Sequence, residues 1–325
     1  MVSKIVNNFR EEMNRMGARK TPFFFIADFE MNRPLLYPLD QLPDDIYFST
    51  PGYRRIPDLP GITAPLQLKS HPVGFDVYRR SFENVIGNIE HGNSYLLNLT
   101  FPTEIDINLT LTEIFLMSSA KYKLLYRDKF VVFSPEIFVT MDKGVIRSYP
   151  MKGTIDASIP GAKDIILQDE KELAEHNTIV DLIRNDLSIV SNNVDVTRYR
   201  YIDLIKTSEK DLLQVSSEIT GDLEDDWMKT VGDIIVSILP AGSISGAPKR
   251  ETTRIIKESE IDERGYYTGV FGLFDGERVD SAVMIRFIEQ NGGKYVYRSG
   301  GGITYLSDVR KEYDELISKV YVPVG

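Results

Sequence analysis

A lysine stands between a proline and a glycine in the segment SYPMKGT, residues 148–154. Pro150 restricts the chain to an extended bend, and Gly153 allows a close turn directly after the lysine. If Lys152 points into a partly desolvated cleft, its neutral form is favoured, and a neutral amine can attack an electrophilic carbon. The alternative is a surface lysine in a turn after a strand, and the motif by itself favours that alternative.

A glutamate follows a proline at the end of an apolar run in SPEIF, residues 134–138. A carboxyl group beside a buried strand can stay protonated and act as a general acid, which is the role we consider for Glu136. The alternative is a solvated glutamate at the end of a strand.

Two predicted helices each carry a pair of glutamates on one face. Glu172 and Glu175 are three residues apart, and so are Glu312 and Glu315, with Lys319 one turn later. Carboxylates from two helices that face one cavity would suit Mg²⁺, which binds few protein oxygens and keeps several waters. The alternative for each helix is a solvated charged face, and this reading is favoured when either helix is taken alone.

Three further segments could bind an anion. The stretch PAGSISGAPK, residues 240–249, includes Ser245 and opens a helix, so its backbone amides could receive an anion. The glycines at 300–302 follow a predicted strand and allow a ligand close to the backbone. Arg286 lies inside the otherwise apolar segment 282–287 and needs a carboxylate partner, either from a substrate or from a structural salt bridge.

Hydrophobic periodicity and turn residues predict the elements that must position these side chains. Proline-rich loops and short edge strands are expected at 30–75, a strand–turn–strand at 130–150, and one uninterrupted helix at 164–187. Helices are also expected at 1–20, 77–90, 225–238, from the 240–247 turn to 259, and in the last segment to 320, and strands at 21–29, 94–101, 211–219, 266–274, 279–288 and 294–299. Long helices combined with antiparallel-type strand pairs favour an α+β fold.

Composition limits the classes of function. The 325 residues carry 38 basic and 48 acidic side chains, a formal charge of −10, which disfavours nucleic-acid binding. The absence of cysteine excludes disulfides, thiolate metal sites and a cysteine nucleophile in this chain. The first apolar run, at 23–27, is too short for a signal peptide or a membrane span, so a cytoplasmic protein without membrane contact is expected.

Taken in order, these segments resemble the chorismate-utilising enzymes, a family that includes the first components of aminodeoxychorismate synthase and anthranilate synthase and also the isochorismate and salicylate synthases. The resemblance runs from about 77 to 320 and is strongest at 174–186, 240–249, 264–269 and 299–303. It implies one catalytic domain over 1–325, with a shortened, divergent part at 1–75 and the core at 76–322. It also implies two antiparallel sheets packed face to face, with helices outside and the active site in a central cleft.

The resemblance also implies a role for each candidate residue. Glu175 and Glu315 are the expected Mg²⁺ ligands, with Glu172 and Glu312 acting through water. Arg286, Tyr267 and the backbone of Gly301 and Gly302 correspond to the binders of the ring carboxylate, Lys319 to the partner of the enolpyruvyl carboxylate, Glu136 to the general acid, and Thr154 and Ser245 to further substrate contacts.

The lysine position distinguishes members of the family. Aminodeoxychorismate synthases read Pro-Ile-Lys-Gly-Thr, similar to the motif around Lys152, whereas anthranilate synthases have alanine at that position. A lysine that adds to C2 as the C4 oxygen leaves lets ammonia attack C4, whereas without it ammonia attacks C2 and gives the ortho product. Two departures stand out: Leu96 where aminating relatives usually have glutamine and isochorismate and salicylate synthases have a lysine, and Gln214 where many members have histidine.

Because glutamine hydrolysis in this system uses a cysteine that the chain lacks, the expected nitrogen source is free ammonia or a separate glutamine amidotransferase subunit. Two alternatives stay open. One is anthranilate synthase component I, against which Lys152 argues. The other is a catalytically silent scaffold relative, against which the presence of Glu175 and Glu315 argues.

Overall fold

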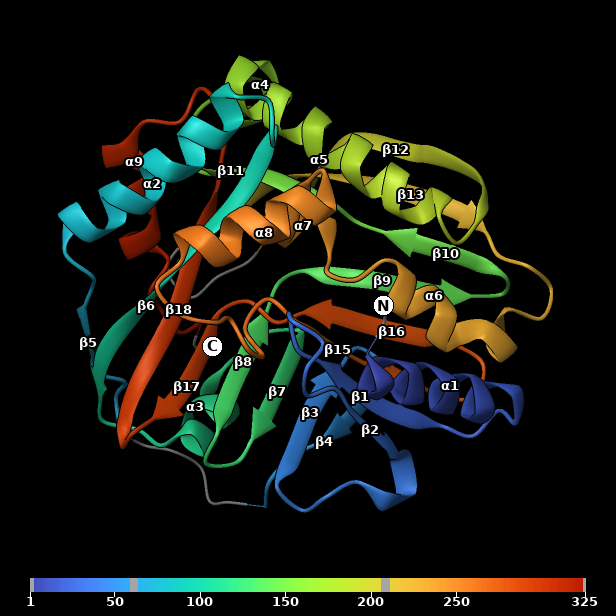
Figure 1. Cartoon of the computed structure of the whole chain (residues 1–325). Coiled ribbons are helices and arrows are strands. Elements are labelled where there is room, and N and C mark those ends of the chain that lie inside the picture. Colours follow the sequence, from blue (N-terminus) through green and yellow to red (C-terminus); the bar gives the residue numbers. More distant parts are fainter. Residues whose placement is uncertain (1–2, 59–63, 206–210, 324–325) are drawn as a thin grey trace. The chain divides into compact units, whose positions relative to one another are not determined.

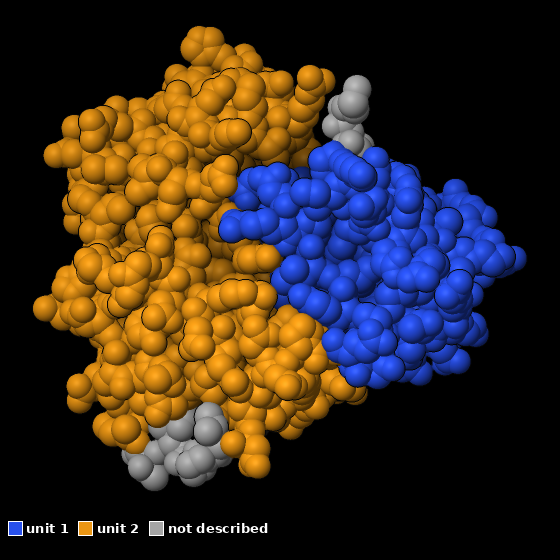
Figure 2. All heavy atoms as spheres, turned by 60° about the horizontal axis from the view of Figure 1, so that its bottom comes forward, with its two compact units in different colours: residues 1–41, 136–243, 269–283 blue, residues 42–135, 244–268, 284–325 orange. Residues whose placement is uncertain are grey.

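The computed structural model describes residues 3–58, 64–205 and 211–323. It divides into two compact units, each built on one nine-stranded sheet (Figure 1). The first unit comprises 1–41, 136–243 and 269–283, and the second comprises 42–135, 244–268 and 284–325, coloured blue and orange in Figure 2. Both units are therefore assembled from segments far apart in the sequence.

The sheet of the first unit runs in the order β11-β13-β10-β9-β16-β15-β1-β2, and β12 pairs with β13. Strand β1 is buried along its whole length because its apolar sequence FFFIA lies between β15 and β2. The strands are β1 (Phe23–Ala27), β2 (Leu35–Pro38), β9 (Ile137–Asp142), β10 (Val145–Ser148), β11 (Met151–Asp156), β12 (Asn192–Ile205), β13 (Leu212–Asp222), β15 (Val270–Phe274) and β16 (Val279–Val283).

Helices of the first unit pack on this sheet and on one another. Helix α1 packs against η2 and α6, and α5 contacts β11, β12 and β13 (Figure 1). The helices are α1 (Lys4–Ala18), η1 (Leu39–Gln41), α4 (Ala162–Gln168), α5 (Glu170–Ser188), η2 (Trp227–Thr230) and α6 (Val231–Ser237), and the short α7 (Gly242–Ser245) begins in this unit and ends in the second.

The sheet of the second unit has the order β14-β6-β18-β17-β8-β7-β3-β4, and β5 pairs with β6. Helices α2 and α9 contact each other and β18, and α8 contacts α2 and β6. The elements are β3 (Ile46–Thr50), β4 (Tyr53–Arg55), β5 (Leu68–His71), α2 (Phe75–Glu90), β6 (Leu96–Ile107), α3 (Leu111–Met117), β7 (Tyr122–Tyr126), β8 (Phe130–Ser134), β14 (Gly246–Ala247), α8 (Lys249–Ser259), β17 (Phe287–Asn291), β18 (Lys294–Ile303) and α9 (Val309–Ser318).

All described strand pairs are antiparallel, and helices accompany both sheets, so the predicted α+β class with two antiparallel sheets is confirmed. The face-to-face packing of the sheets, the central cleft and the single catalytic domain stay predictions. No helix in the described part of the chain has both the length and the apolar character needed to cross a membrane.

The predicted helix at 164–187 is wrong in its continuity, because the chain leaves the helical conformation at Asp169. With ψ at 112°, Asp169 ends α4, and its side chain accepts a hydrogen bond from the backbone N–H of Glu172 at the start of α5. An aspartate competes with the helix in this way because its oxygen can cap the next helix. The break places Glu172 in the first turn of α5.

The predicted strand at 279–288 is also wrong, because β16 ends at Val283 and β17 begins at Phe287. Arg286 has φ +55°, in the left-handed region that interrupts a strand. By contrast, the glycines at 300–302 lie within β18 and not after it, since Gly301 and Gly302 pair with Leu99 and Asn98 of β6.

A buried ion pair in the second unit ties three segments together. The Arg264 guanidinium donates to both carboxylate oxygens of Glu260 at 2.9 and 2.7 Å, and also to the carbonyls of Ile244 and Asn98. Glu260 in turn accepts from the backbone and hydroxyl of Thr100. The two side chains are 1% and 4% exposed, so loss of either leaves its partner buried without a counter-charge.

Replacing Arg264 by methionine is expected to lower the free energy of unfolding by about 3–5 kcal/mol, the cost of removing one member of a buried pair. Urea denaturation followed by circular dichroism measures the effect. The matched control is Arg254→Met, which removes an arginine that pairs with Glu251 and Glu258 on the exposed face of α8. Equal stability of the two variants would contradict the structural role of the buried pair.

Candidate active site

Lys152 lies in β11, and its ammonium nitrogen is 2.9 Å from Oε2 of Glu175 on α5. The side chains are 27% and 14% exposed, so the pair is partly withdrawn from water and not splayed into solvent. Gly153 has φ +80°, and the pairing of β11 with β13 shifts register between Met151 and Thr154. The irregular backbone after Pro150 therefore presents the lysine to α5.

The second glutamate of α5 lies beside the same turn. A Cβ atom placed on Gly153 would lie 3.0 Å from Oε2 of Glu172, so the glycine makes room for this carboxylate. The structure thus gathers Lys152, Glu172 and Glu175 in the first unit. Thr154, by contrast, is exposed in β11 opposite Gln214 of β13.

A histidine with no role predicted from the sequence is connected to the turn before Lys152. His176 is buried, and its Nε2 is 2.7 Å from the hydroxyl of Ser217. Burial, together with the positive charges of Arg200 and Lys152, lowers the pKa of His176 to about 4, so it is neutral at ordinary pH. The Ser217 backbone N–H donates to the carbonyl of Pro150, which links the histidine to the lysine turn.

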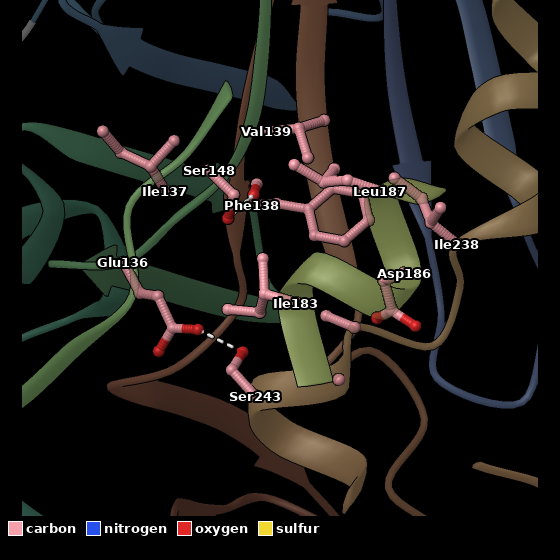
Figure 3. A pocket seen from close by; sticks show the side chains of 12 residues that line it. Glu136, Ile137, Phe138, Val139, Ser148, Ile183, Asp186, Leu187, Ile238 and Ser243 are labelled. Atoms are coloured by element: carbon pink, nitrogen blue, oxygen red, sulfur yellow. Dashed lines mark hydrogen bonds between the residues drawn. The ribbon is translucent and has the colours of Figure 1, made fainter. Parts of the chain in front are cut away.

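Glu136 lies between β8 and β9 at the rim of a pocket in the first unit, where its Oε1 accepts a hydrogen bond from the Ser243 hydroxyl (Figure 3). The empty space at the pocket, counted together with the open solvent at its mouth, is about 340 Å³. Its wall is mostly apolar, from Phe138, Ile183 and neighbouring residues, with Asp186 as a second carboxylate. A carboxyl group in such a place is suited to donating a proton to a ligand. The Ser243 contact joins residues 107 positions apart, so no local sequence pattern indicates it.

In the second unit, the end of α9 gathers charged side chains over the glycines of β18. A Cβ atom on Gly301 would lie 3.4 Å from Glu312, 3.6 Å from Glu315 and 3.8 Å from the Lys319 ammonium. Lys319 donates to the Gly300 carbonyl at 2.8 Å and pairs with Glu315 at 2.6 Å. Glu312 is buried and accepts from the Ser307 hydroxyl, whereas Glu315 is half exposed.

Arg286 is largely buried in the second unit, and no carboxylate pairs with it among the described residues. Burial by itself lowers the pKa of Arg286, but the nearby phenols of Tyr297 and Tyr321 raise it above its usual value. Tyr267 is also buried, which raises its pKa to about 12, partly opposed by Arg264 and Arg286, so it stays a neutral phenol. The structural salt bridge considered as an alternative is therefore wrong for the described part of the chain.

The other positions singled out in the sequence lie in the second unit. Ser245 is buried at the end of α7, and Gly302 pairs with Asn98 in the sheet. Leu96 is buried and pairs with Ala247 of β14. The predicted residues therefore divide between the units, and ion pairs join Lys152 to Glu175 in the first unit and Glu315 to Lys319 in the second.

The glutamate pairs of α5 and α9 are the candidate ligands for a divalent ion. The described residues include no group of three or more histidine, aspartate or glutamate side chains arranged as a metal site. The first unit instead supplies Glu172 beside Gly153 and Glu175 beside Lys152, and the second supplies Glu312 and Glu315 near Gly301. All four donors are oxygens, which fits Mg²⁺, an ion held by one or two protein carboxylates together with water and ligand.

Comparison with known proteins decides the family. Residues 57–324 match the family described as chorismate binding enzyme. The chain belongs to this family. The match begins at residue 57, earlier than the resemblance noted in the sequence, which starts at about 77, and it includes every predicted site residue.

Individual relatives agree with this assignment. An uncharacterized PabA-like protein of Haemophilus influenzae is 50% identical over 325 residues, covering 100% of this chain and 99% of the relative. Aminodeoxychorismate synthase component 1 of Bacillus subtilis is 28% identical over 302 residues, which are 87% of this chain but 63% of that protein. The crystal structure of anthranilate synthase component I from Streptococcus pneumoniae superposes with a TM-score of 0.67 at 27% identity, covering 79% of this chain and 59% of that one.

Proposed function

We propose that this chain is the first component of an aminodeoxychorismate synthase, which converts chorismate and ammonia into 4-amino-4-deoxychorismate for 4-aminobenzoate and folate biosynthesis. The single observation that carries the proposal is Lys152 in its Pro-Met-Lys-Gly-Thr motif, partly buried and paired with Glu175. Membership in the family supplies the substrate class. The similarity to the Bacillus subtilis enzyme over 87% of this chain supports the same product.

In the proposed reaction, the Lys152 nitrogen adds to C2 of the chorismate ring. The two ring double bonds shift toward C4, the C4–O bond breaks, and the hydroxyl leaves as water with a proton from Glu136. Ammonia then attacks C4, the double bonds shift back, and the lysine leaves C2 as an amine. The nucleophile thus directs nitrogen to the carbon para to the ring carboxylate.

Lys152 must lose a proton before it attacks, because the neutral amine is the nucleophile. Glu175, 2.9 Å away, is within hydrogen-bond distance to accept that proton. The pair therefore holds the lysine in one place while controlling its charge.

Glu136 must hold a proton when chorismate binds and release it as the C4 hydroxyl leaves. The Ser243 hydroxyl can donate to a carboxylate or accept from a carboxylic acid, so one contact orients Glu136 in both states. The apolar wall of the pocket limits the hydration of this carboxyl group.

Mg²⁺ would be held by Glu175 and Glu315, with Glu172 and Glu312 reached through water, and it would supply positive charge to neutralise the ring carboxylate. Arg286 and Tyr267 would supply donors to the same carboxylate, together with the backbone at Gly301 and Gly302. Lys319 would face the enolpyruvyl carboxylate, and Thr154 and Ser245 are the further substrate contacts of the proposal.

Glu315→Ala is expected to raise the Mg²⁺ concentration for half-maximal activity by about 10–100-fold, the usual loss when a ligand or its support is removed. Activity is measured against Mg²⁺ concentration, with excess chelator as the zero point. The matched control is Asp314→Ala, which removes the neighbouring exposed carboxylate that pairs with Arg310. Full activity in excess chelator would contradict a metal requirement.

The proposed nitrogen source is ammonia, delivered by a separate glutamine amidotransferase subunit. The reason is chemical: the chain contains no cysteine, the nucleophile on which glutamine hydrolysis in this system depends. Activity with ammonium but not with glutamine is therefore expected for the isolated chain.

Anthranilate synthase component I is the alternative, favoured by the likeness to the Streptococcus pneumoniae structure. Mass spectrometry of products from chorismate, Mg²⁺ and ammonium separates the two. Formation of 4-amino-4-deoxychorismate, which an added lyase converts to 4-aminobenzoate, supports the proposal. Fluorescent anthranilate as the main product would replace it with the alternative.

A further inference from the structure

We propose that Tyr321, in the segment that follows α9, acts together with Arg286 as an anion-binding residue for the substrate carboxylate. This inference rests on the proposed function, because it extends the site that the function requires. It concerns residues of the second unit alone.

Arg286 lies beside the aromatic ring of Tyr321. Its guanidinium carbon lies 5.1 Å from the centre of the Tyr321 ring, and the Tyr321 phenol is among the groups that raise the pKa of Arg286. No carboxylate of the described residues neutralises this arginine, and its Nε has no hydrogen-bond partner there. A largely buried guanidinium without a counter-charge is suited to binding an anion from outside the chain.

The Tyr321 phenol can act as a hydrogen-bond donor as well as an acceptor. An arginine has only donors, so toward Arg286 the Tyr321 oxygen can only accept. A phenol that accepts in this way keeps its own hydrogen for another acceptor. Since Tyr321 is 47% exposed, that hydrogen is accessible to a bound ligand. The guanidinium and the phenol therefore present donors to the same anion.

The segment after α9 is anchored in a way that holds Tyr321 in place. The buried phenol of Tyr297 donates to the Tyr321 carbonyl at 2.9 Å. On one side, Lys319 donates to the Gly300 carbonyl at 2.8 Å; on the other, the Pro323 carbonyl accepts from the Ser119 N–H at 3.1 Å. Val322 is buried in the core cluster of this unit. Tyr321 is thus an exposed side chain on a fixed backbone, which is the arrangement of a binding residue.

Benzoate tests the inference, because it offers a ring carboxylate without reacting. Its dissociation constant is measured by calorimetry for the full chain and for Tyr321→Phe, which keeps the ring over Arg286 and removes only the hydroxyl. We expect this constant and the KM for chorismate to rise about threefold to tenfold, the loss of one hydrogen bond, with kcat unchanged. Arg286→Ala is expected to abolish benzoate binding.

The matched control is Tyr47→Phe. Tyr47 also lies beside an arginine, Arg127, whose guanidinium is 5.2 Å from its ring and donates to its hydroxyl at 2.7 Å, but on an exposed surface. Unchanged binding in Tyr321→Phe, equal weakening in Tyr47→Phe, or no benzoate binding by the unmodified chain would overturn the inference. If Tyr321→Phe weakens benzoate binding while the unmodified chain makes anthranilate, Tyr321 keeps its role and the proposed function fails.

Discussion

Replacing Lys152 by alanine is expected to reduce formation of 4-amino-4-deoxychorismate on the order of 10³-fold or more, the scale seen when a covalent nucleophile is removed. The reason is that ammonia no longer meets a ring activated at C2, so the route to C4 closes. The remaining direct route places ammonia at C2, and the assay therefore measures both the para and the ortho product by mass spectrometry.

The fold is expected to survive this substitution, because the Lys152 side chain is partly exposed in β11. Circular dichroism should therefore be unchanged. Lys163→Ala, at an exposed position on α4, serves as the control and should keep full activity. A Lys152→Ala protein that makes the para product at the normal rate would remove the lysine from the mechanism.

Replacing Glu136 by glutamine is expected to lower the rate on the order of 10²–10⁴-fold, the usual contribution of a general acid. Glutamine keeps nearly the same shape and can still accept the hydrogen bond from Ser243, but it has no proton to give to the leaving hydroxyl. The rate should also lose the decline at high pH that reports ionisation of an essential acid.

A pH–rate profile of the variant and the parent measures both effects. Glu277→Gln, on the exposed turn between β15 and β16, is the matched control and should keep the parental profile. A Glu136→Gln variant that retains both the rate and the profile would show that the proton comes from another group.

Parts of the fold that depend on local pattern could be predicted from the sequence. The apolar run at 23–27 forms the buried strand β1, and the periodic segment at 77–90 forms most of α2. The acidic pairs of α5 and α9 follow from helical spacing, so their shared faces could be foreseen before their surroundings were known.

Other features depend on contacts between distant residues. Ser243 reaches Glu136 across 107 positions, and His176 reaches Ser217 across 41, so no local pattern indicates either contact. Strand β12 was not predicted either, because its residues are exposed or half-buried and show no buried apolar face. Its pairing with β13 defines it instead. Asp169 interrupts the helix expected at 164–187, and Arg286 interrupts the strand expected at 279–288. In each case one residue leaves the regular backbone conformation.

The central claim is that an amine of this chain bonds covalently to the ring carbon C2. Its most direct test is intact-protein mass spectrometry after mixing the chain with chorismate and Mg²⁺ without ammonium, followed by peptide mapping. The account predicts an added mass equal to chorismate minus one water, located on Lys152 and discharged when ammonium is added. Product formation at the full rate with no such adduct, or with the adduct on another residue, would contradict it.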